Sequence, residues 1–296
     1  LQGNGSAMDV QAQRLHIVSA DLQLSEASSI LVHDDLTLDR FYFHGVNSST
    51  LDIRAARQVG ITESLGMFYG ELLVTIEQGD FAAGYVDVDR GKLVLTAQTG
   101  SLLVDTLHGS IGEYNIELHA AEDIGSSQKP LYFYMQPGVY TLSKETFDWG
   151  RNLYLDYNRS SNEPLVLNKQ GAGNVDLTLN GSGVEITQAG TLGGAIKAQG
   201  KTVVVTTTAG SIGTQEAPLN VVTALAVTLR SAEDIWMCNG ESGTILKEVT
   251  AKGTISLETD GTFSNYWEQT PVIRSEAGSI ALRAAQISRA QLQTIT

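Results

Sequence analysis

The sequence predicts an all-β protein, a parallel β-helix or β-solenoid in which each coil of the chain stacks on the coil before it. Three observations predict this fold. Apolar and polar residues alternate along most of the chain, glycine-centred turns separate the alternating segments, and one longer phrase occurs twice. With 42% hydrophobic residues over 296 positions, the chain has enough apolar surface for a core.

Segments with a period of two occur from the N-terminal third to the C-terminus. In each segment every second side chain is apolar, and Thr, Lys, Asn, Glu or Arg stands between them. This alternation predicts short strands that bury one face. The clearest segments, in chain order, are 93–97, 116–120, 175–179, 203–205, 225–229, 255–257 and 280–282.

Turns of the form glycine, small polar residue, aliphatic residue separate these segments. We expect the glycine to supply a positive φ at a tight corner and the aliphatic residue to return the chain to the core. A turn that repeats about every 20 residues indicates a solenoid, because the loops of a β-sandwich have no reason to repeat. At about 22 residues per coil, the chain predicts on the order of 13 coils and a rod about 60 Å long. The glycines are Gly100, Gly109, Gly190, Gly210, Gly243, Gly253 and Gly278.

The repeated phrase is AAEDIGSSQKPLYF at 120–133 and TAGSIGTQEAPLNV at 208–221. Each copy carries Ile-Gly, a short polar stretch and Pro-Leu, and the second copy starts 88 residues after the first. That distance is about four coils of 22 residues. We therefore expect the isoleucine to point inward, the glycine to turn, and Pro-Leu to start the next strand.

Several phrases resemble the repeat region of large bacterial exoproteins of the filamentous-haemagglutinin type. They are AGSIGTQEAPLNV, AEDIWM, AKGTISLETDGTF and EAGSIALRAAQIS, and the resemblance is clearest over 90–130 and 170–296. The resemblance implies a right-handed parallel β-helix that is secreted or on the bacterial cell surface. It also implies a structural or adhesive role, either as a filament-forming shaft or in attachment. The secretion-domain signatures of such proteins are not evident, which suggests an internal stretch of shaft.

The expected organisation is a single continuous solenoid over 1–296. It consists of N-terminal coils at 1–130, an aromatic-rich segment at 131–163 and C-terminal coils at 164–296. No capping segment follows the last alternating stretch, and solenoid ends without caps expose unpaired backbone. We expect the chain to be a piece of a larger protein whose ends continue or associate with further copies.

The segment 131–163 carries eight of the 20 aromatic residues and lacks the glycine turn, which predicts an elaborated coil or a hairpin. Aromatic side chains interleaved with polar ones make good binding anchors. One interpretation is a contact with a host or matrix glycan or protein. The other is a hydrophobic cover packed against the flank of the solenoid. The candidate ligand-binding residues are Tyr132, Tyr134, Trp149, Tyr154 and Tyr157.

The charge of the chain argues against two classes of partner. The formal net charge is −14, with only 19 Lys and Arg residues. Nucleic acid and anionic membrane surfaces both attract cationic proteins, so neither is an expected partner. No run of about 18 apolar residues predicts a transmembrane helix, and we expect no membrane insertion.

No motif predicts a metal, a cofactor or a catalytic centre. Asp87 and Asp89 precede Gly91 as in a calcium loop, but the distal glutamate is missing, so we expect Val88 inward and both carboxylates outward. Cys238 is the only cysteine, predicted to be a small buried side chain. The acidic residues are scattered and the five histidines share no motif. The alternative function is a carbohydrate-active β-helix enzyme, a polysaccharide lyase or hydrolase, or a glycan-binding module.

Overall fold

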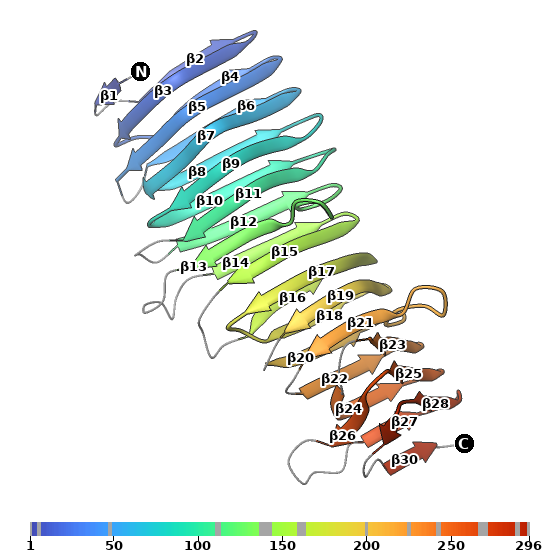
Figure 1. Cartoon of the computed structure of the whole chain (residues 1–296). Helices are drawn as coiled ribbons and strands as arrows, with labels where there is room; N and C mark the ends of the chain where they lie inside the picture. The colour runs from blue at the N-terminus through green and yellow to red at the C-terminus, as the bar shows by residue number, and fades with distance from the viewer. Residues whose placement is uncertain are drawn as a thin grey trace. The chain divides into compact units, whose positions relative to one another are not determined.

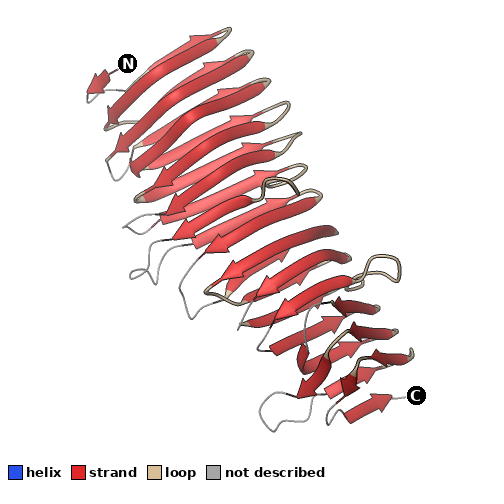
Figure 2. Cartoon of the chain, viewed as in Figure 1, coloured by secondary structure: helices blue, strands red, loops and turns tan. Residues whose placement is uncertain are grey.

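The computed structural model describes most of the chain and contains strands and loops but no helix in the part described (Figures 1 and 2). The described residues are 2–4, 7–46, 49–109, 114–135, 144–158, 164–198, 201–223, 226–240, 244–265, 272–287 and 291–294. The fold is a β-solenoid of about 12 turns, close to the predicted number. Its chain divides into two compact units, Leu1–Asp156 and Tyr157–Thr296.

Unit 1 contains two parallel sheets whose strands alternate along the chain. Each coil contributes one strand to each sheet, so the neighbour of a strand is the strand two places along (Figure 1). Sheet A1 consists of β1 (Gln2–Asn4), β3 (Leu15–Leu24), β5 (Asp35–Gly45), β7 (Gln58–Tyr69), β9 (Phe81–Val88), β11 (Leu102–Gly109), β13 (Leu131–Met135) and β15 (Asn152–Asn158), in which the boundary falls. Sheet B consists of β2 (Asp9–Ala12), β4 (Ser28–Val32), β6 (Thr50–Ala55), β8 (Glu71–Ile76), β10 (Gly91–Ala97), β12 (Tyr114–Ala120) and β14 (Lys144–Trp149).

Unit 2 repeats this plan with two parallel sets of strands, which we name sheets A2 and C. Sheet A2 consists of β17 (Gly173–Asn180), β19 (Leu192–Ala198), β21 (Leu219–Thr223), β23 (Ile235–Asn239), β25 (Ile255–Thr259) and β28 (Ile280–Arg283). Sheet C consists of β16 (Leu165–Lys169), β18 (Val184–Gln188), β20 (Thr202–Thr207), β22 (Ala226–Ser231), β24 (Thr244–Ala251), β26 (Thr262–Asn265) and β29 (Gln286–Ile287), with β27 (Val272–Ser275) and β30 (Gln291–Thr294) alongside. The prediction that the units form one continuous solenoid stays a prediction.

The core of each unit consists of columns of aliphatic side chains, one residue per coil. In sheet B the register places Leu51 opposite Leu72 and Leu72 opposite Leu93, and all three are fully buried. In sheet A2 the column runs through Ile235, Ile255 and further isoleucines. Each inward residue therefore packs on its equivalents in the adjacent coils, which confirms the predicted solenoid core.

The glycine corners are needed for close approach and not for the positive φ that we predicted. A Cβ at Gly100 would lie 2.2 Å from the carbonyl oxygen of Gly79, one coil earlier. At Gly210 it would lie 2.4 Å from the backbone nitrogen of Thr191. Successive corners stack so tightly that only glycine fits between them. Six of the predicted corner glycines are described and lack a positive φ: Gly100, Gly109, Gly190, Gly210, Gly253 and Gly278.

Two turns of the predicted set, at Gly109 and Gly243, differ from the other five in where they stand along the chain. Gly109 is the last residue of β11, and the residues after it lie outside those described. Gly243 also lies outside them, and the strand that follows it, β24, belongs to sheet C. A short glycine motif therefore does not by itself fix which corner of the coil it occupies.

The repeated phrase folds as predicted in both units. Ile124 and Ile212 are fully buried, and each bridges to strands of the coils before and after it. Gly125 and Gly213 have φ values of +70° and +67°. The Pro-Leu pairs then lead into β13 and β21, which begin at Leu131 and Leu219.

The described parts of 131–163 are strands of the coil, not a protruding hairpin. Strand β13 pairs in parallel with β11, and β14 pairs in parallel with β12. The register between β12 and β14 joins Asn115 to Lys144, a step of 29 residues, whereas β10 and β12 are joined by a step of 23. Of the two predicted forms, the elaborated coil agrees with this lengthened step. Residues 136–143 and 159–163 lie outside those described.

Candidate functional site

Aromatic side chains from successive coils meet on the outward face of sheet A1. The outward position is set by the alternation within each strand, and the register brings these positions side by side. Tyr42 of β5 lies opposite Gly66 of β7, Asp87 of β9 lies opposite His108 of β11, and His108 lies opposite Tyr134 of β13. We call the following eight side chains the ring row: Tyr42, His44, Phe68, Tyr69, Tyr85, His108, Tyr132 and Tyr134.

Stacked aromatic pairs lie at both ends of the ring row, between β5 and β7 and between β11 and β13. The rings of His44 and Phe68 are parallel within 3°, with centroids 4.4 Å apart. The rings of His108 and Tyr134 lie 5.4 Å apart and within 12° of parallel, and Tyr132 stacks beside Tyr134 at 6.4 Å. Aromatic pairs in this range of distances stabilise one another beyond the area that they bury. The rings are therefore held in place by their neighbours.

A glycine makes room for one ring. A Cβ at Gly66 would lie 2.5 Å from Cδ1 of Tyr42, so the tyrosine ring occupies the space above the Gly66 backbone. The hydroxyl of Tyr42 lies 3.1 Å from that of Ser64, which fixes the far end of the ring. The guanidinium of Arg90 lies over the Tyr69 ring, 5.6 Å from its centroid.

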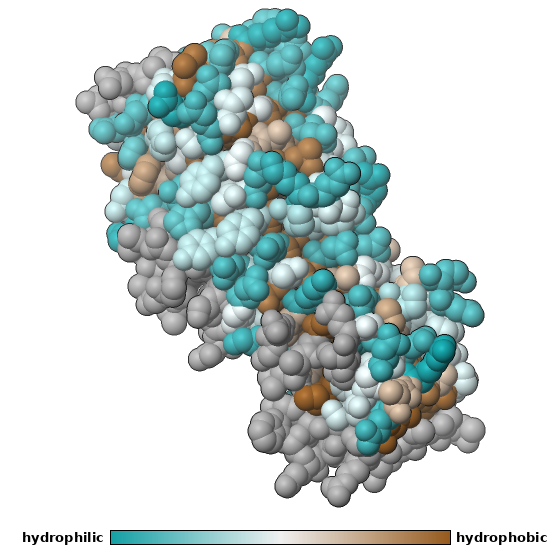
Figure 3. All heavy atoms as spheres, viewed as in Figure 1, coloured by the Kyte–Doolittle hydropathy of each residue, from teal (hydrophilic) through white to brown (hydrophobic). Residues whose placement is uncertain are grey.

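Three tyrosines of the ring row expose a substantial part of their surface. Tyr69 is 39% exposed, Tyr85 37% and Tyr132 36%, and the other five are half-buried. Polar and pale side chains cover most of the visible surface of unit 1, with apolar residues showing between them (Figure 3). The ring row is therefore a solvent-accessible surface and not part of the core.

Carboxylates pair with the histidines of the ring row. Oδ1 of Asp87 lies 3.1 Å from Nδ1 of His108, and Oδ1 of Asp21 lies 3.3 Å from Nε2 of His44. Each pair joins two adjacent coils. On β11, Asp105 also pairs with Lys129. These three carboxylates therefore have partners from the chain itself.

Two groups on this face have shifted pKa values. Burial raises the pKa of the Tyr85 hydroxyl, and the charge of Asp87 adds to the rise. The pKa of Asp39 is lowered, first by a hydrogen bond donated by the Thr62 hydroxyl at 2.7 Å and then by His16 at 3.2 Å. Tyr85 therefore remains a neutral hydrogen-bond donor at neutral pH, and Asp39 remains a carboxylate.

The predicted ligand-binding residues separate into two groups. Tyr132 and Tyr134 lie outward and belong to the ring row. Trp149 is 1% exposed and Tyr157 is fully buried, so neither presents a surface to a ligand. Tyr154 is half-buried, and its N–H donates to the carbonyl of Ile124.

Sequence reasoning missed the other six members of the ring row. Only part of the signal was available, because alternation marks Tyr42 and His44 as outward but the register between coils decides which rings meet. It was overlooked because the aromatic residues of 131–163 cluster in the sequence, whereas those of β5 to β11 cluster only in space.

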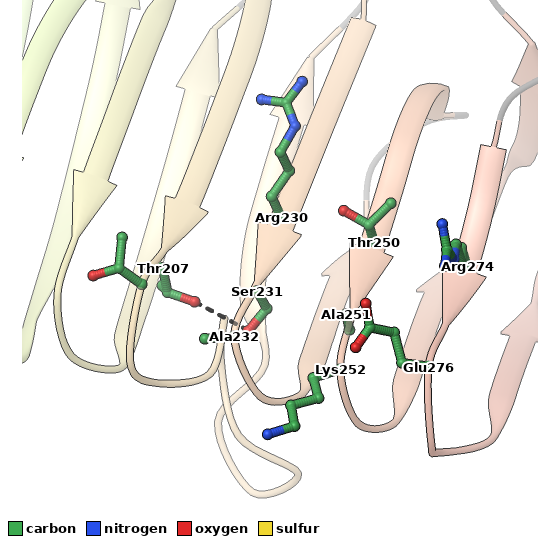
Figure 4. A pocket seen from close by; sticks show the side chains of 10 residues that line it. Thr207, Arg230, Ser231, Ala232, Thr250, Ala251, Lys252, Arg274 and Glu276 are labelled. Carbon is green, nitrogen blue, oxygen red and sulfur yellow. Dashed lines mark hydrogen bonds between the residues drawn. The ribbon is translucent and has the colours of Figure 1, made fainter. Parts of the chain in front are cut away.

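The charged side chains of a groove on unit 2 do not converge on a common point. This open groove, about 660 Å³ in volume, crosses the ends of β20, β22, β24 and β27. In Figure 4 the side chains of Arg230 and Lys252 point in opposite directions. The guanidinium of Arg230 already binds Glu248, with Nη2 to Oε2 at 2.7 Å. The ring row is therefore the stronger candidate site.

The described residues contain no group of three or more His, Cys, Asp or Glu side chains arranged to hold a metal ion. As predicted, Val88 is buried, and Asp87 bonds outward to His108. Cys238 was predicted to be buried, but it lies half-buried on the outward side of β23, because inward Met237 fixes the alternation.

The chain has no match among known proteins in three comparisons. No family model matches it, and neither the curated proteins nor the solved structures provide a relative. Within the described part of the chain, no helix is long and apolar enough to cross a membrane. The interpretation of function therefore depends on the fold and on the ring row.

Proposed function

We propose that this chain is a structural, non-catalytic β-solenoid shaft of a secreted or cell-surface bacterial protein, and that its outward face mediates attachment to a host or matrix glycan or protein. The resemblance to exoprotein repeats supports the location and the adhesive role. The solenoid architecture is consistent with a structural repeat shaft. Association through the solenoid ends with further copies belongs to the same proposal.

One observation carries the shaft proposal: the inward positions of adjacent coils are equivalent in register. In sheet B, Val74 lies opposite Leu95, and in the next coil Leu95 lies opposite Leu118. All three are buried. Coils that only determine the length of a shaft can replace one another. A coil that carries a catalytic group cannot be replaced by its neighbour.

Deletion of one coil tests this equivalence. Removal of residues 74–94 joins Leu73 to Leu95 and fuses β8 to β10 at matching positions. Strand β7 then faces β11, because both pair with β9 in the same direction. We expect the shortened chain to keep its β-sheet circular dichroism and to melt cooperatively, within about 10 °C of the full chain.

The matched control removes 74–93, one residue fewer. The extra residue moves Leu95 to the outward face and Thr96 to the core, because a one-residue shift reverses every side chain of a strand. We expect the cooperative transition to be lost or strongly lowered. Equal behaviour of the two deletions, or cleavage of polysaccharides by the wild-type chain, would overturn the proposal.

A further inference from the structure

We propose that the ring row of unit 1 binds an extended neutral oligosaccharide. This inference rests on the proposed attachment role and names the site and the class of ligand. The site is the outward face of sheet A1, from β5 to β13. Its ligand stacks sugar rings on exposed tyrosines and makes hydrogen bonds to the polar side chains between them.

The ring row offers both kinds of contact that a sugar requires. A pyranose has apolar C–H faces and a rim of hydroxyl groups. Tyr85 and Tyr132 present exposed ring surface for the apolar face. The hydroxyls of Tyr85 and Thr106 lie among these rings, since the register places Thr106 opposite both Tyr85 and Tyr132. A stacking surface edged by hydroxyl groups suits a polyhydroxylated ligand.

The charges on this face favour a neutral ligand. Asp21 and Asp87 pair with the histidines of the ring row, and Asp105 pairs with Lys129. The guanidinium of Arg90 contacts the ring row and already lies over the ring of Tyr69. A polyanion would also be repelled by a net charge of −14. Ring stacking and hydrogen bonds, not ion pairs, therefore supply the affinity.

The repeat of the coils favours an extended ligand over a single sugar. Adjacent strands of a sheet lie about 4.8 Å apart, and the ring row crosses the five strands β5, β7, β9, β11 and β13. Tyr85 and Tyr132 stand on β9 and β13, and His108 stands on β11, two residues along from Thr106, which lies opposite both tyrosines. A chain of sugars that runs across the strands of unit 1 meets a ring at several successive positions.

The rings are ordered before a ligand arrives. Stacking of His108 on Tyr134 and of His44 on Phe68 restricts four of the eight rings. The space over Gly66 and the bond to Ser64 restrict Tyr42. Ordered side chains lose little conformational entropy on binding, which favours a measurable affinity from shallow contacts.

The experiment screens the full chain against immobilised neutral and acidic oligosaccharides, then measures Kd for the best neutral ligand. We expect binding to neutral oligosaccharides, with a Kd that changes less than about twofold between about 0.05 and 0.5 M NaCl. Tyr85→Ala and Tyr132→Ala should each weaken binding about tenfold. Tyr85→Phe keeps the ring and should bind within about threefold of the wild type.

Trp236→Ala is the matched control, because Trp236 is a half-buried outward aromatic on sheet A2. It should leave the Kd unchanged. Thermal melting of each variant confirms folding, and a tyrosine-to-alanine variant that fails to melt like the wild type is replaced by the corresponding leucine variant.

Three outcomes would overturn the inference: no neutral oligosaccharide binds, only acidic ones bind, or the tyrosine variants bind like the wild type. None of these outcomes bears on the coil deletion, which tests the shaft by folding. Failure of the glycan test with a folded 74–94 deletion leaves the shaft proposal standing. Failure of both deletions to fold, with glycan binding intact in the wild type, leaves the ring row standing.

Discussion

The two copies of the repeated phrase, one in each unit, form the same turn and lead into different surfaces. The N–H of Gly125 donates to the carbonyl of Leu102 at 2.9 Å, and the N–H of Gly213 donates to that of Leu192 at 2.7 Å. In the loops that follow, Ser126 and Thr214 each donate their N–H to a carbonyl three residues on, both at 3.0 Å. The same backbone bonds therefore form around different side chains.

The strands after the two turns both bury apolar residues and differ in chemical character on their outward side. Leu131 and Leu219 are both fully buried. Next to them, unit 1 has Tyr132, which is 36% exposed and part of the ring row, whereas unit 2 has Asn220. The fold constrains the corner and the inward positions, and it leaves the outward positions free. Chemistry specific to this chain should therefore be sought where the two copies diverge.

A second difference lies inside the units, at the corner before each A strand. In unit 1 the register aligns Ala55, Ile76 and Ala97, which are apolar. At the end of sheet C most of the aligned residues are polar, and Ala251 is the apolar exception between Ser231 and Ser275. The polar side chains donate hydrogen bonds to carbonyl groups of the corner; they are Gln188, Thr207, Ser231 and Ser275. The corner is thus closed by packing in unit 1 and by buried hydroxyl and amide groups in unit 2.

The largest expected effect comes from replacing the glycine that both turns share. Gly125→Val and Gly213→Val each place a branched side chain at a positive φ, with Cβ 2.5 Å from the carbonyl oxygen of Tyr154 and 2.2 Å from that of Trp236. Each should lower the free energy of unfolding by about 3 kcal/mol or more in urea denaturation.

Two other glycines separate the cost of backbone strain at a positive φ from the cost of steric overlap of the Cβ. Gly171 has a φ of +97°, but a Cβ at this position would have no other atom within 4 Å, so Gly171→Ala should cost about 1 kcal/mol from backbone strain alone. Gly240 has neither feature, and Gly240→Ala should change the stability by less than about 0.5 kcal/mol. If the two valine variants differ strongly from each other, the turns are not energetically equivalent.

The next effect tests the polar column of unit 2. The Ser275 hydroxyl is fully buried, donates to the carbonyl of Gly253 at 2.6 Å and accepts from the N–H of Gly278 at 2.9 Å. Ser275→Ala leaves both backbone groups without this partner and should cost about 2 kcal/mol by urea denaturation.

The control for this loss is Ser256→Ala, which removes a hydroxyl from a half-buried outward position of β25. It should change the stability by less than about 0.5 kcal/mol. In unit 1, Ala97→Ser introduces a buried hydroxyl into the apolar column and should destabilise the chain by about 1 kcal/mol. A neutral Ser275→Ala would show that the polar column does not stabilise unit 2.

Alternation was sufficient to predict the fold and the side that the aromatics of β14 and β15 occupy. In β14, Phe147 and Trp149 flank outward Asp148, and in β15 Leu155 precedes buried Tyr157 by two residues. The same rule that predicts strands thus places Trp149 and Tyr157 in the core. The clustering of aromatics in 131–163 suggested a ligand contact for all five candidates, but clustering in sequence says nothing about the face.

The ring row itself could not be assembled from the sequence, because it depends on register between coils of unequal length. The pairing of β5 with β7 shifts by one residue between Phe43 and His44, so that His44 lies opposite Tyr69. The step from Thr106 to Tyr132 is 26 residues, whereas the step from Tyr85 to Thr106 is 21. These irregularities decide which rings meet, and no fixed period reproduces them. The space that Gly66 leaves for Tyr42 likewise depends on three-dimensional packing.

The smallest expected effect compares single carboxylates on the outward faces of the two units. Asp39 accepts hydrogen bonds from the adjacent coils, and Thr62 and His16 lower its pKa. Asp176 is an exposed outward carboxylate of β17 in unit 2. Because the pKa of Asp39 is lowered on folding, its contribution to stability is present above about pH 5 and is lost as the pH falls below about 4. Asp39→Asn should therefore lower the melting temperature by about 1–2 °C at pH 7 and by less at pH 2.5.

Asp176→Asn makes the same change of charge on the other unit and should leave the melting temperature unchanged at both pH values. Thr62→Val removes the main cause of the lowered pKa, so the pKa of Asp39, followed by NMR titration, should rise toward its ordinary value of about 3.9. An equal effect of the two asparagine substitutions would show that net charge, and not the bonds between coils, governs stability in acid. A difference confined to Asp39 would show that the outward face of unit 1 is held together by contacts between its own coils, which is the order that the ring row requires before a ligand binds.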